Sequence, residues 1–336
     1  MNDTAQRWAV VATVNEPPVL VQSFVAWHLS LGAAEISLYF DRPDDPVADL
    51  FLALPQVHMI RCDDRHWQAL GRRPVKHEVR QSQNATQAYE RTGCDWLVHM
   101  DADEFLWPTG NVADHLAAAD TLADGLAVPV AERIYDGTAR CSSIYDGLFR
   151  RPFSSTMKDG HPIFDNSHGA LSRGLTGHTI GKAFARTGRH LRIAIHRPRL
   201  PNQKRIVPMI SRAAGLELLH FDGLTPLHWM AKFLRAAHLQ PRAVQTPPPH
   251  RLKQMQAVLE APNEALELHD LLKVADRSLI TALDRYDLLL RANFSPQAAL
   301  KTYFPAQDVD VSTAAFDAWL WAEKGDLLRS NGFEPR

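Results

Sequence analysis

The first hundred residues alternate short apolar runs with stretches of helical spacing, and this alternation limits the folds open to the chain more than any other feature. Strands are expected at 7–14, 35–40, 57–61 and 95–100. The segment 76–92 has helical composition and ends before Gly93, whereas 63–75 is polar and is expected to be a loop. Strands that alternate with helices build parallel sheets. We therefore predict an α/β fold with a mostly parallel sheet flanked by helices.

The alternation weakens after residue 105, and the character of the chain changes again near residue 240. A proline-rich linker occupies 241–249, and the chain beyond it has helical spacing, including an expected long helix over 263–291. At roughly 150 residues per domain, a chain of 336 residues has room for two. We expect a sheet domain over 1–240 and a helical C-terminal region over 241–336.

Polar and acidic residues follow each of the four expected strands. They are Asn15 and Glu16, Asp41 to Asp45, Asp63 and Asp64, and Asp101 to Glu104. Ligands of parallel α/β sheets bind outside the carboxyl ends of the strands. A crowd of carboxylates at that edge is costly unless a cation or a hydrogen-bonding ligand neutralises it. The pattern predicts a binding site at this edge.

The sharpest motif is Asp101-Ala102-Asp103-Glu104, directly after the strand at 95–100. Two carboxylates one residue apart at a strand end are able to reach the same divalent cation. Mg²⁺ and Mn²⁺ prefer such oxygen ligands and keep positions for diphosphate oxygens. The alternative is a solvated acidic turn, which this short pattern also fits. The preceding buried strand and the acidic residues after the earlier strands favour Asp101 and Asp103 as ligands of a metal–diphosphate site.

Three further side chains are candidates for donor binding. Arg80 and Asn84 share one face of the expected helix 76–92 and offer a cation and an amide to a sugar or phosphate. Lys182 follows Gly181 and is placed to meet a diphosphate. In each case a solvated surface position is the alternative.

The chain has 16 histidines but no H-E-x-x-H motif and no His/Cys cluster with zinc-ligand spacing. His28, His58 and His99 fall within expected helices or strands and are interpreted as structural. His220 differs because it ends an apolar strand just before a helix. We therefore predict that His220 is a third ligand of the same metal, with His196 as a weaker candidate.

Composition excludes several classes of protein. The 37 Lys and Arg nearly balance the 38 Asp and Glu, so the chain lacks the positive field of a general nucleic-acid binder. No run of 18 apolar residues is present, and no transmembrane segment is expected. The three cysteines, Cys62, Cys94 and Cys141, are far apart, which fits a reducing cytoplasm. We expect a cytoplasmic protein, with peripheral attachment to the inner face of a membrane left open.

With these residues in view, the sequence resembles bacterial family 2 glycosyltransferases, in the branch with Asn-Glu after the first strand. The most specific segment is Asp95 to Phe105, which reads DWLVHMDADEF. The other matching segments are Thr13 to Glu16, Phe24 to Gly32, Tyr39 to Asp41 with Asp44 and Asp45, Arg80 to Tyr89, and, more loosely, Phe164-Asp165, Gly181-Lys182, His196 and Leu219 to Asp222 with Lys232. The resemblance implies a Rossmann-like sheet of the GT-A type and covers most of 8–235.

The resemblance also implies roles for individual residues. Asn15, Glu16 and Asp41 would hold the nucleoside, and Asp101 and Asp103 would bind Mn²⁺ or Mg²⁺ with the diphosphate. Inverting members use a carboxylate base to deprotonate the acceptor hydroxyl. This sequence lacks the family's acidic pair with its Q-x-x-R-W-type motif, so the base does not transfer by position. Asp165 is our choice for it, with Glu132 and Asp222 as rivals.

The expected function is transfer of a sugar from a nucleotide-diphosphate sugar to a glycan or lipid-linked acceptor, with inversion and with a divalent cation. One alternative is a nucleotidyltransferase, although Asn15-Glu16-Pro17-Pro18 stands where such enzymes have a glycine-rich basic loop. A haloacid-dehalogenase-like phosphatase would need Thr where Phe105 stands. A catalytically silent nucleotide-sugar-binding protein is the third alternative.

Overall fold

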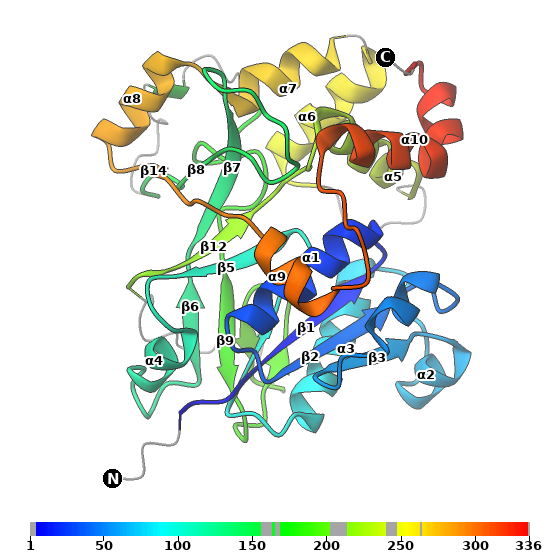
Figure 1. Cartoon of the computed structure of the whole chain (residues 1–336), viewed down its shortest axis with the longest axis vertical. Helices are drawn as coiled ribbons and strands as arrows, with labels where there is room; N and C mark the ends of the chain where they lie inside the picture. The colour runs from blue at the N-terminus through cyan, green and yellow to red at the C-terminus, as the bar shows by residue number, and fades with distance from the viewer. Residues whose placement is uncertain are drawn as a thin grey trace. The chain divides into compact units, whose positions relative to one another are not determined.

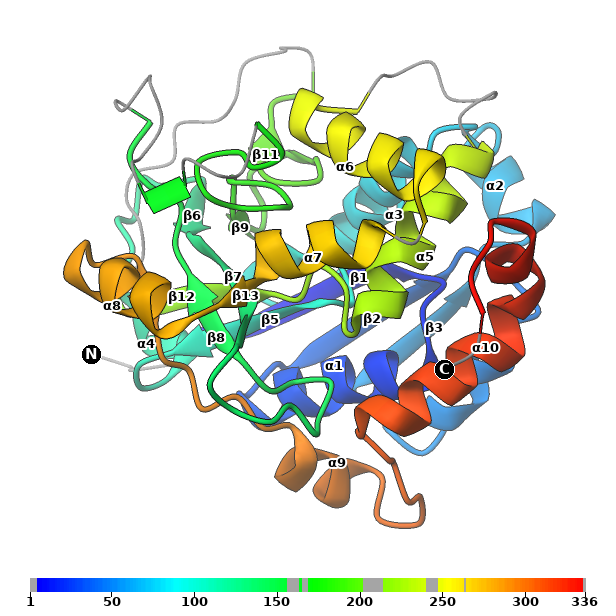
Figure 2. The ribbon, with the colours of Figure 1, turned by 90° about the horizontal axis from the view of Figure 1, so that it is seen from above.

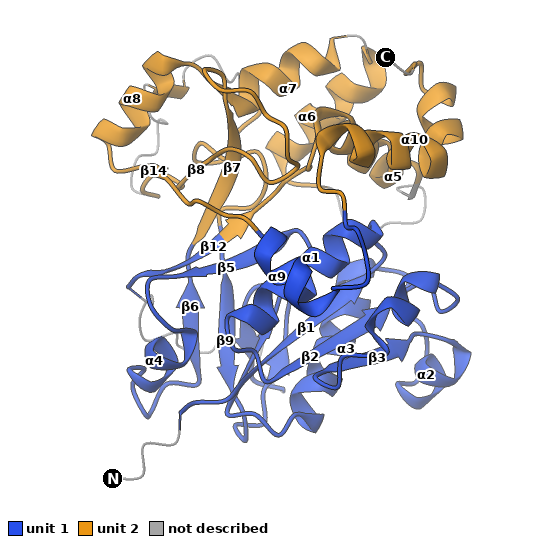
Figure 3. Cartoon of the chain, in the orientation of Figure 1, with its two compact units in different colours: residues 1–129, 180–218, 296–309 blue, residues 130–179, 219–295, 310–336 orange. Residues whose placement is uncertain are grey.

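The computed structural model describes residues 5–155, 163–164, 169–201, 214–239, 247–262 and 264–334. Asp165, the predicted base, lies outside the described residues. The chain forms two compact units (Figure 3). Unit 1 comprises 1–129, 180–218 and 296–309, and unit 2 comprises 130–179, 219–295 and 310–336. These units differ from the expected division at residue 240, because the chain passes between them several times.

Unit 1 is built on a six-stranded sheet in the order β3-β2-β1-β4-β9-β6 (Figure 1). β1 pairs with β2 and β4 in parallel, β2 pairs with β3 in parallel, and β9 is antiparallel to β4 and β6. The strands of unit 1 are β1 (Trp8–Val14), β2 (Glu35–Phe40), β3 (Val57–Arg61), β4 (Trp96–His99), β5 (Glu104–Pro108), β6 (Gly125–Val128), β9 (Lys182–Arg186), β10 (Arg192–Ile193) and β11 (Pro198–Arg199). The predicted α/β fold with a mostly parallel sheet is confirmed.

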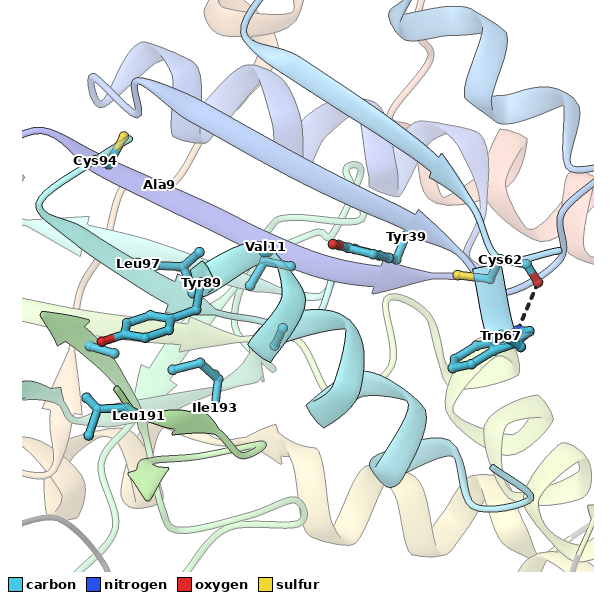
Figure 4. Close-up of a cluster of buried hydrophobic side chains, with 13 residues drawn as sticks. Ala9, Val11, Tyr39, Cys62, Trp67, Tyr89, Cys94, Leu97, Leu191 and Ile193 are labelled. Atoms are coloured by element: carbon cyan, nitrogen blue, oxygen red, sulfur yellow. Dashed lines mark hydrogen bonds between the residues drawn. The ribbon is translucent and has the colours of Figure 1, made fainter. Parts of the chain in front are cut away.

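Helices cover both faces of this sheet, with α1 and α3 on opposite sides (Figure 2). The helices of unit 1 are α1 (Pro18–Ser30), the 3₁₀ helix η1 (Pro46–Phe51), α2 (Asp64–Ala69), α3 (His77–Arg91), α4 (Val112–Ala117) and α9 (Gln297–Tyr303). All seven residues of β1 are buried, as expected for a central strand with both faces covered. On the α3 side, Ala9 and Val11 of β1 pack with Ala88 and Tyr89 of the helix (Figure 4).

The expected loop at 63–75 contains the short helix α2. Its first turn is stabilised by Asp63, whose Oδ1 accepts a hydrogen bond from the backbone N–H of His66 at 2.8 Å. Trp67 then buries its ring in the core next to α3. The sequence pattern missed this helix because its six residues supply a single buried side chain, too few to show a helical period.

Unit 2 combines a small sheet with a cluster of helices. β7 (Val130–Asp136) is antiparallel to β8 (Leu148–Arg150) and parallel to β13 (Val274–Ala275), and β8 is antiparallel to β14 (Leu289–Leu290). The helices of unit 2 are α5 (Pro226–Leu239), α6 (Pro249–Glu260), α7 (Ala265–Lys273), α8 (Arg277–Arg285) and α10 (Thr313–Ser330). β12 (Leu216–His220) begins in unit 1 and ends in unit 2.

The expected helix over 263–291 is divided into α7, β13, α8 and β14. Asp276 explains the restart, because its side chain accepts from the backbone N–H of Leu279 at 2.7 Å and thereby caps α8. Residues 296–309 do not belong with the other C-terminal residues, since α9 lies in unit 1 and Phe304 contacts Phe51 there. None of the helices in the described part of the chain combines the length and the apolar composition that a membrane crossing requires.

The start of β9 approaches β6 more closely than a side chain would permit. A Cβ on Gly181 would lie 1.8 Å from the carbonyl oxygen of Val128. We expect Gly181→Ala to push β9 away from β6 and to lower stability by roughly 1–3 kcal/mol, the usual cost of overpacking. Gly93→Ala is the matched control, because its Cβ would meet nothing closer than 3.8 Å. Equal urea midpoints for the two variants would contradict this close approach.

Candidate functional site

The candidate site lies at the carboxyl edge of the unit 1 sheet. The residues that directly follow β2 and β4 there are bonded to β1, because the backbone N–H of Asp41 donates to the carbonyl of Val14 at 3.1 Å and that of Met100 to the carbonyl of Val11 at 3.0 Å. The strand order reverses between β1 and β4, since β2 and β3 lie on one side of β1 and β4 on the other. A crevice for ligands forms at such a reversal. Asn15 and Glu16 follow β1 there, and Asp101 follows β4.

The acidic motif is held by a buried lysine. The ammonium of Lys182, at the start of β9, lies 2.7 Å from Oδ2 of Asp101 and 3.1 Å from Oε2 of Glu104. The side chain of Lys182 is 1% exposed and that of Glu104 is fully buried, whereas that of Asp101 is 32% exposed. The three groups therefore form a charge cluster in which Lys182 and Glu104 are enclosed by protein and Asp101 is partly accessible to solvent.

The turn between β4 and β5 is closed by two reciprocal hydrogen bonds. The backbone N–H of Asp101 donates to Oε2 of Glu104 at 2.8 Å, and the backbone N–H of Glu104 donates to the carbonyl of Asp101 at 3.0 Å. Gln81 of α3 donates from Nε2 to Oδ1 of Asp101 at 2.6 Å. Asp101 is thus oriented from both of its carboxylate oxygens.

Burial and charge act in opposite directions on Lys182. Burial alone would lower the pKa of the lysine, but Asp101 and Glu104 outweigh it and raise the pKa above the usual value. Lys182 is therefore a permanent cation at neutral pH. For the nearby His99, burial first and then Lys182 lower the pKa to about 4, so this histidine is neutral.

Asp41 and Arg80 form the second ion pair at this edge. Nε and Nη2 of Arg80 donate to the two carboxylate oxygens of Asp41, each at 2.8 Å, and Arg73 adds a contact at 3.1 Å. Burial would raise the pKa of Asp41, but these arginines lower it overall. The structure thus brings the predicted residues Asp41 and Arg80 together as partners of each other.

Asn84 lies fully buried under the sheet edge. Its Nδ2 donates to Oγ1 of Thr13 at 3.0 Å, and its Oδ1 lies 2.9 Å from Nε2 of His66. These contacts tie α3 to β1 and to α2. The contact of Asn84 and Arg80 with the sugar or phosphate of a donor molecule stays a prediction.

Other predicted residues lie at the same edge or in unit 2. Asn15 is exposed, and Glu16 and Asp103 are partly exposed. His220 ends β12 in unit 2, where its ring stacks on that of His178 with centroids 4.7 Å apart. In the described part of the chain, no three or more His, Cys, Asp or Glu side chains are grouped to hold a metal ion. The assignment of Asp101, Asp103 and His220 as metal ligands stays a prediction.

Asp101 and Asp103 nevertheless fit a divalent cation that is shared with a ligand. Mg²⁺ is usually bound through one or two carboxylates, with phosphate oxygens and waters completing its coordination. Asp101 and Asp103 are both accessible, whereas Glu104 faces inward to Lys182. Two of the three acidic side chains of the motif are therefore at least partly accessible to solvent.

A separate buried charge network occupies unit 2. Glu132 on β7 accepts from Nη2 of Arg150 at 3.0 Å, from the backbone of Thr176 at 2.8 Å and from the backbone of Gly177 at 2.6 Å. Lys273 lies 4.0 Å from the same carboxylate. Burial would raise the pKa of Glu132, but Lys273 and Arg150 lower it.

Asp222 belongs to the same network. Arg251 donates to its Oδ2 at 2.8 Å, and Lys232 lies 3.7 Å from its Oδ1. These cations, with Lys273, lower its pKa although burial opposes them. Burial lowers the pKa of Lys273 itself to about 8. Glu132 and Asp222, the rival candidates for the base, are thus buried and paired with cations, which favours a structural role.

No protein-family model and no curated protein sequence matches this chain. Similar solved structures include 4-diphosphocytidyl-2C-methyl-D-erythritol synthase, at 14% identity over 40% of this chain and 65% of that chain, with a TM-score of 0.27. This chain therefore spans less than two thirds of the synthase. TarS 1–349 of S. aureus shares 12% identity over 79% of this chain and 72% of that chain, with a TM-score of 0.29.

The galactosyltransferase LgtC, in complex with donor and acceptor sugar analogues, shares 14% identity over 73% of this chain and 99% of that chain, with a TM-score of 0.24. At TM-scores below 0.3, these likenesses establish neither the activity of this chain nor its family.

The ion pair at Asp41 predicts a pH-dependent stability. The pKa of the Asp41 carboxyl is lower in the folded chain than in the unfolded one. Its contribution to the free energy of unfolding is therefore complete at pH values above the unfolded pKa and is lost as the pH falls through the folded pKa. We expect Asp41→Asn to cost roughly 2 kcal/mol at pH 7, the scale of hydrogen bonds to charged groups, and less below about pH 4. Urea unfolding at both pH values measures this difference. The exposed Asp44→Asn is the control, and a pH-independent cost would contradict the assignment.

The network around Glu132 predicts a large loss of stability on neutralisation. Glu132→Gln leaves Arg150 and Lys273 buried without their carboxylate, a change that typically costs about 3–5 kcal/mol. The urea midpoint measures the loss, and Glu267→Gln at an exposed position is the control. A variant that keeps its stability but loses turnover would instead identify Glu132 as a base.

Proposed function

We propose that the chain is a glycosyltransferase of the nucleotide-diphospho-sugar transferase type, which moves a sugar from a nucleotide-diphosphate donor to a hydroxyl acceptor. The observation that carries the proposal is the position of Asp101 and Asp103. They follow β4 at the reversal of strand order, in the segment that most resembles family 2 glycosyltransferases. Asn15, Glu16 and Asp41 follow β1 and β2 at the same edge, where the donor's nucleoside would bind.

The donor diphosphate would bind beside Asp101 and Asp103, which would hold a Mn²⁺ or Mg²⁺ ion. Such an ion neutralises the negative charge that develops on the leaving group. Gln81, Lys182 and the turn of Glu104 hold Asp101 in place before the ligand arrives, so little reorganisation accompanies binding. His220 as a third ligand is part of the proposal and is not needed for this step.

The acceptor is proposed to be a glycan or a lipid-linked hydroxyl compound. A carboxylate removes the proton of the acceptor hydroxyl while its oxygen attacks the anomeric carbon. The bond from that carbon to the diphosphate breaks, the nucleotide diphosphate leaves, and the configuration inverts. Asp165 is the proposed base. Glu132 and Asp222 are less suitable because each is buried among cations.

The proposal predicts that Asp101→Ala abolishes the metal-dependent part of donor binding. Lys182 retains Glu104 as a partner in this variant, so the fold should survive. A thermal-shift titration with UDP, GDP and CDP, with and without Mn²⁺, measures the effect, since a ligand of the folded state raises the melting temperature. Asp114→Ala, an exposed carboxylate on α4, is the control.

The following outcomes distinguish the alternatives. A nucleotide diphosphate that stabilises the parent only with Mn²⁺, and Asp101→Ala not at all, supports the proposal. Equal stabilisation of both proteins overturns the metal assignment. Products analysed after incubation with UDP- and GDP-sugars separate transfer or hydrolysis of the sugar from nucleotidyl transfer, and an absence of turnover with retained binding favours a silent binding protein.

A further inference from the structure

Lys182 is in an unsuitable position to touch a bound diphosphate. Its side chain is 1% exposed, and its ammonium lies within 3.1 Å of two carboxylates. A group that is enclosed on the protein side of Asp101 acts on a ligand through Asp101. This differs from direct contact with the diphosphate, the role that the sequence suggested.

We propose that Lys182 and Glu104 form a positioning pair that orients Asp101 toward the bound cation. The inference rests on the proposed function and adds a role for two residues that would not touch the donor. The ammonium binds Oδ2 of Asp101 at 2.7 Å, while Glu104 binds both the ammonium and the backbone N–H of Asp101. Gln81 binds the other carboxylate oxygen at 2.6 Å. Asp101 is thereby restrained at three points, with about a third of its side chain left accessible.

The local charge supports this role. The carboxylates of Asp101, Asp103 and Glu104 with the ammonium of Lys182 carry a net charge of −2, which one divalent cation balances. The negative charge of Glu104 offsets the positive charge of the buried Lys182. Lys182 therefore binds Asp101 while the net charge stays equal to that of Asp101 and Asp103 alone. Residues that orient a metal ligand typically change metal affinity by roughly 10- to 100-fold when they are removed.

The experiment compares the parent with Lys182→Met/Glu104→Gln. This double variant keeps Asp101 and Asp103, and its local net charge is also −2. An effect of net charge alone therefore predicts an unchanged dissociation constant for Mn²⁺, whereas positioning predicts a rise of at least about tenfold. Mn²⁺ binding is measured by electron paramagnetic resonance, and circular dichroism checks that the double variant is folded.

Two further measurements complete the test. Lys182→Met alone leaves Glu104 buried without its cation, so the urea midpoint of this single variant should fall below that of the parent. The midpoint should largely recover in the double variant. The control is Arg291→Met/Asp284→Asn, which removes an exposed ion pair with a 2.6 Å contact and should leave Mn²⁺ affinity unchanged.

Each result has one meaning. If the parent binds Mn²⁺ and the double variant binds it equally well, the positioning role is wrong and the proposed function stands. If the parent fails to bind Mn²⁺ both alone and in the presence of a nucleotide diphosphate, the positioning role and the metal-dependent function are both wrong. If the double variant loses affinity for a nucleotide diphosphate in the absence of metal, Lys182 contacts the donor directly and the positioning role is wrong.

Discussion

Carboxylates gathered at one end of a parallel sheet repel one another, and burial removes the water that would screen them. Unit 1 meets this constraint with cations paired to its enclosed carboxylates, among them Asp45, which lies 3.1 Å from Arg42. Asp41 is held by Arg80 through two parallel hydrogen bonds, and Asp101 and Glu104 share Lys182. Asn15, Glu16 and Asp103 stay at least partly exposed to solvent. The edge therefore keeps accessible side-chain oxygens, while its buried carboxylates are paired with cations.

Unit 2 also pairs carboxylates with cations, but there the paired carboxylates of Glu132 and Asp222 are buried. Glu132 and Asp222 are almost fully buried, and Arg150, Lys273 and Arg251 surround them. Buried ion networks of this kind add little to the net stability of a protein. Removing one partner is nevertheless strongly destabilising, because it leaves the other charge buried without compensation. Thr176 joins the two carboxylates by contacts of 2.9 Å and 2.8 Å. The network thus links β7, β8 and α7 of unit 2 and contains no accessible carboxylate.

Local patterns in the sequence were sufficient for the central strands and for the acidic edge. β1 to β4 were predicted because each is a short apolar run that ends at polar residues, and the position of Asp101 follows from β4 alone. On α3, the helical spacing identified the right helix, and Asn84 of the predicted face is buried. The buried stripe contains Gln81, Asn84 and Ala85, and Arg80 lies at its border.

Contacts between distant segments were beyond local patterns. Lys182 and Asp101 are 81 residues apart, and their meeting depends on β9 being antiparallel to β4. The interleaving of the two units, with α9 in unit 1, has the same origin. Only weak local signals marked these features, such as Gly181 before Lys182.

The register of β9 explains why a lysine at position 182 acts on this motif. Val98 of β4 lies opposite Phe184, and in an antiparallel pair two residues further along β4 face two residues earlier along β9. Lys182 therefore lies level with Met100, immediately before Asp101. Glu104 begins β5 on the other side of the turn and points inward to the same ammonium. The carboxylate at the fourth position of the motif, Glu104, thus pairs with the lysine, and of the motif's three carboxylates only Asp101 and Asp103 remain candidate metal ligands.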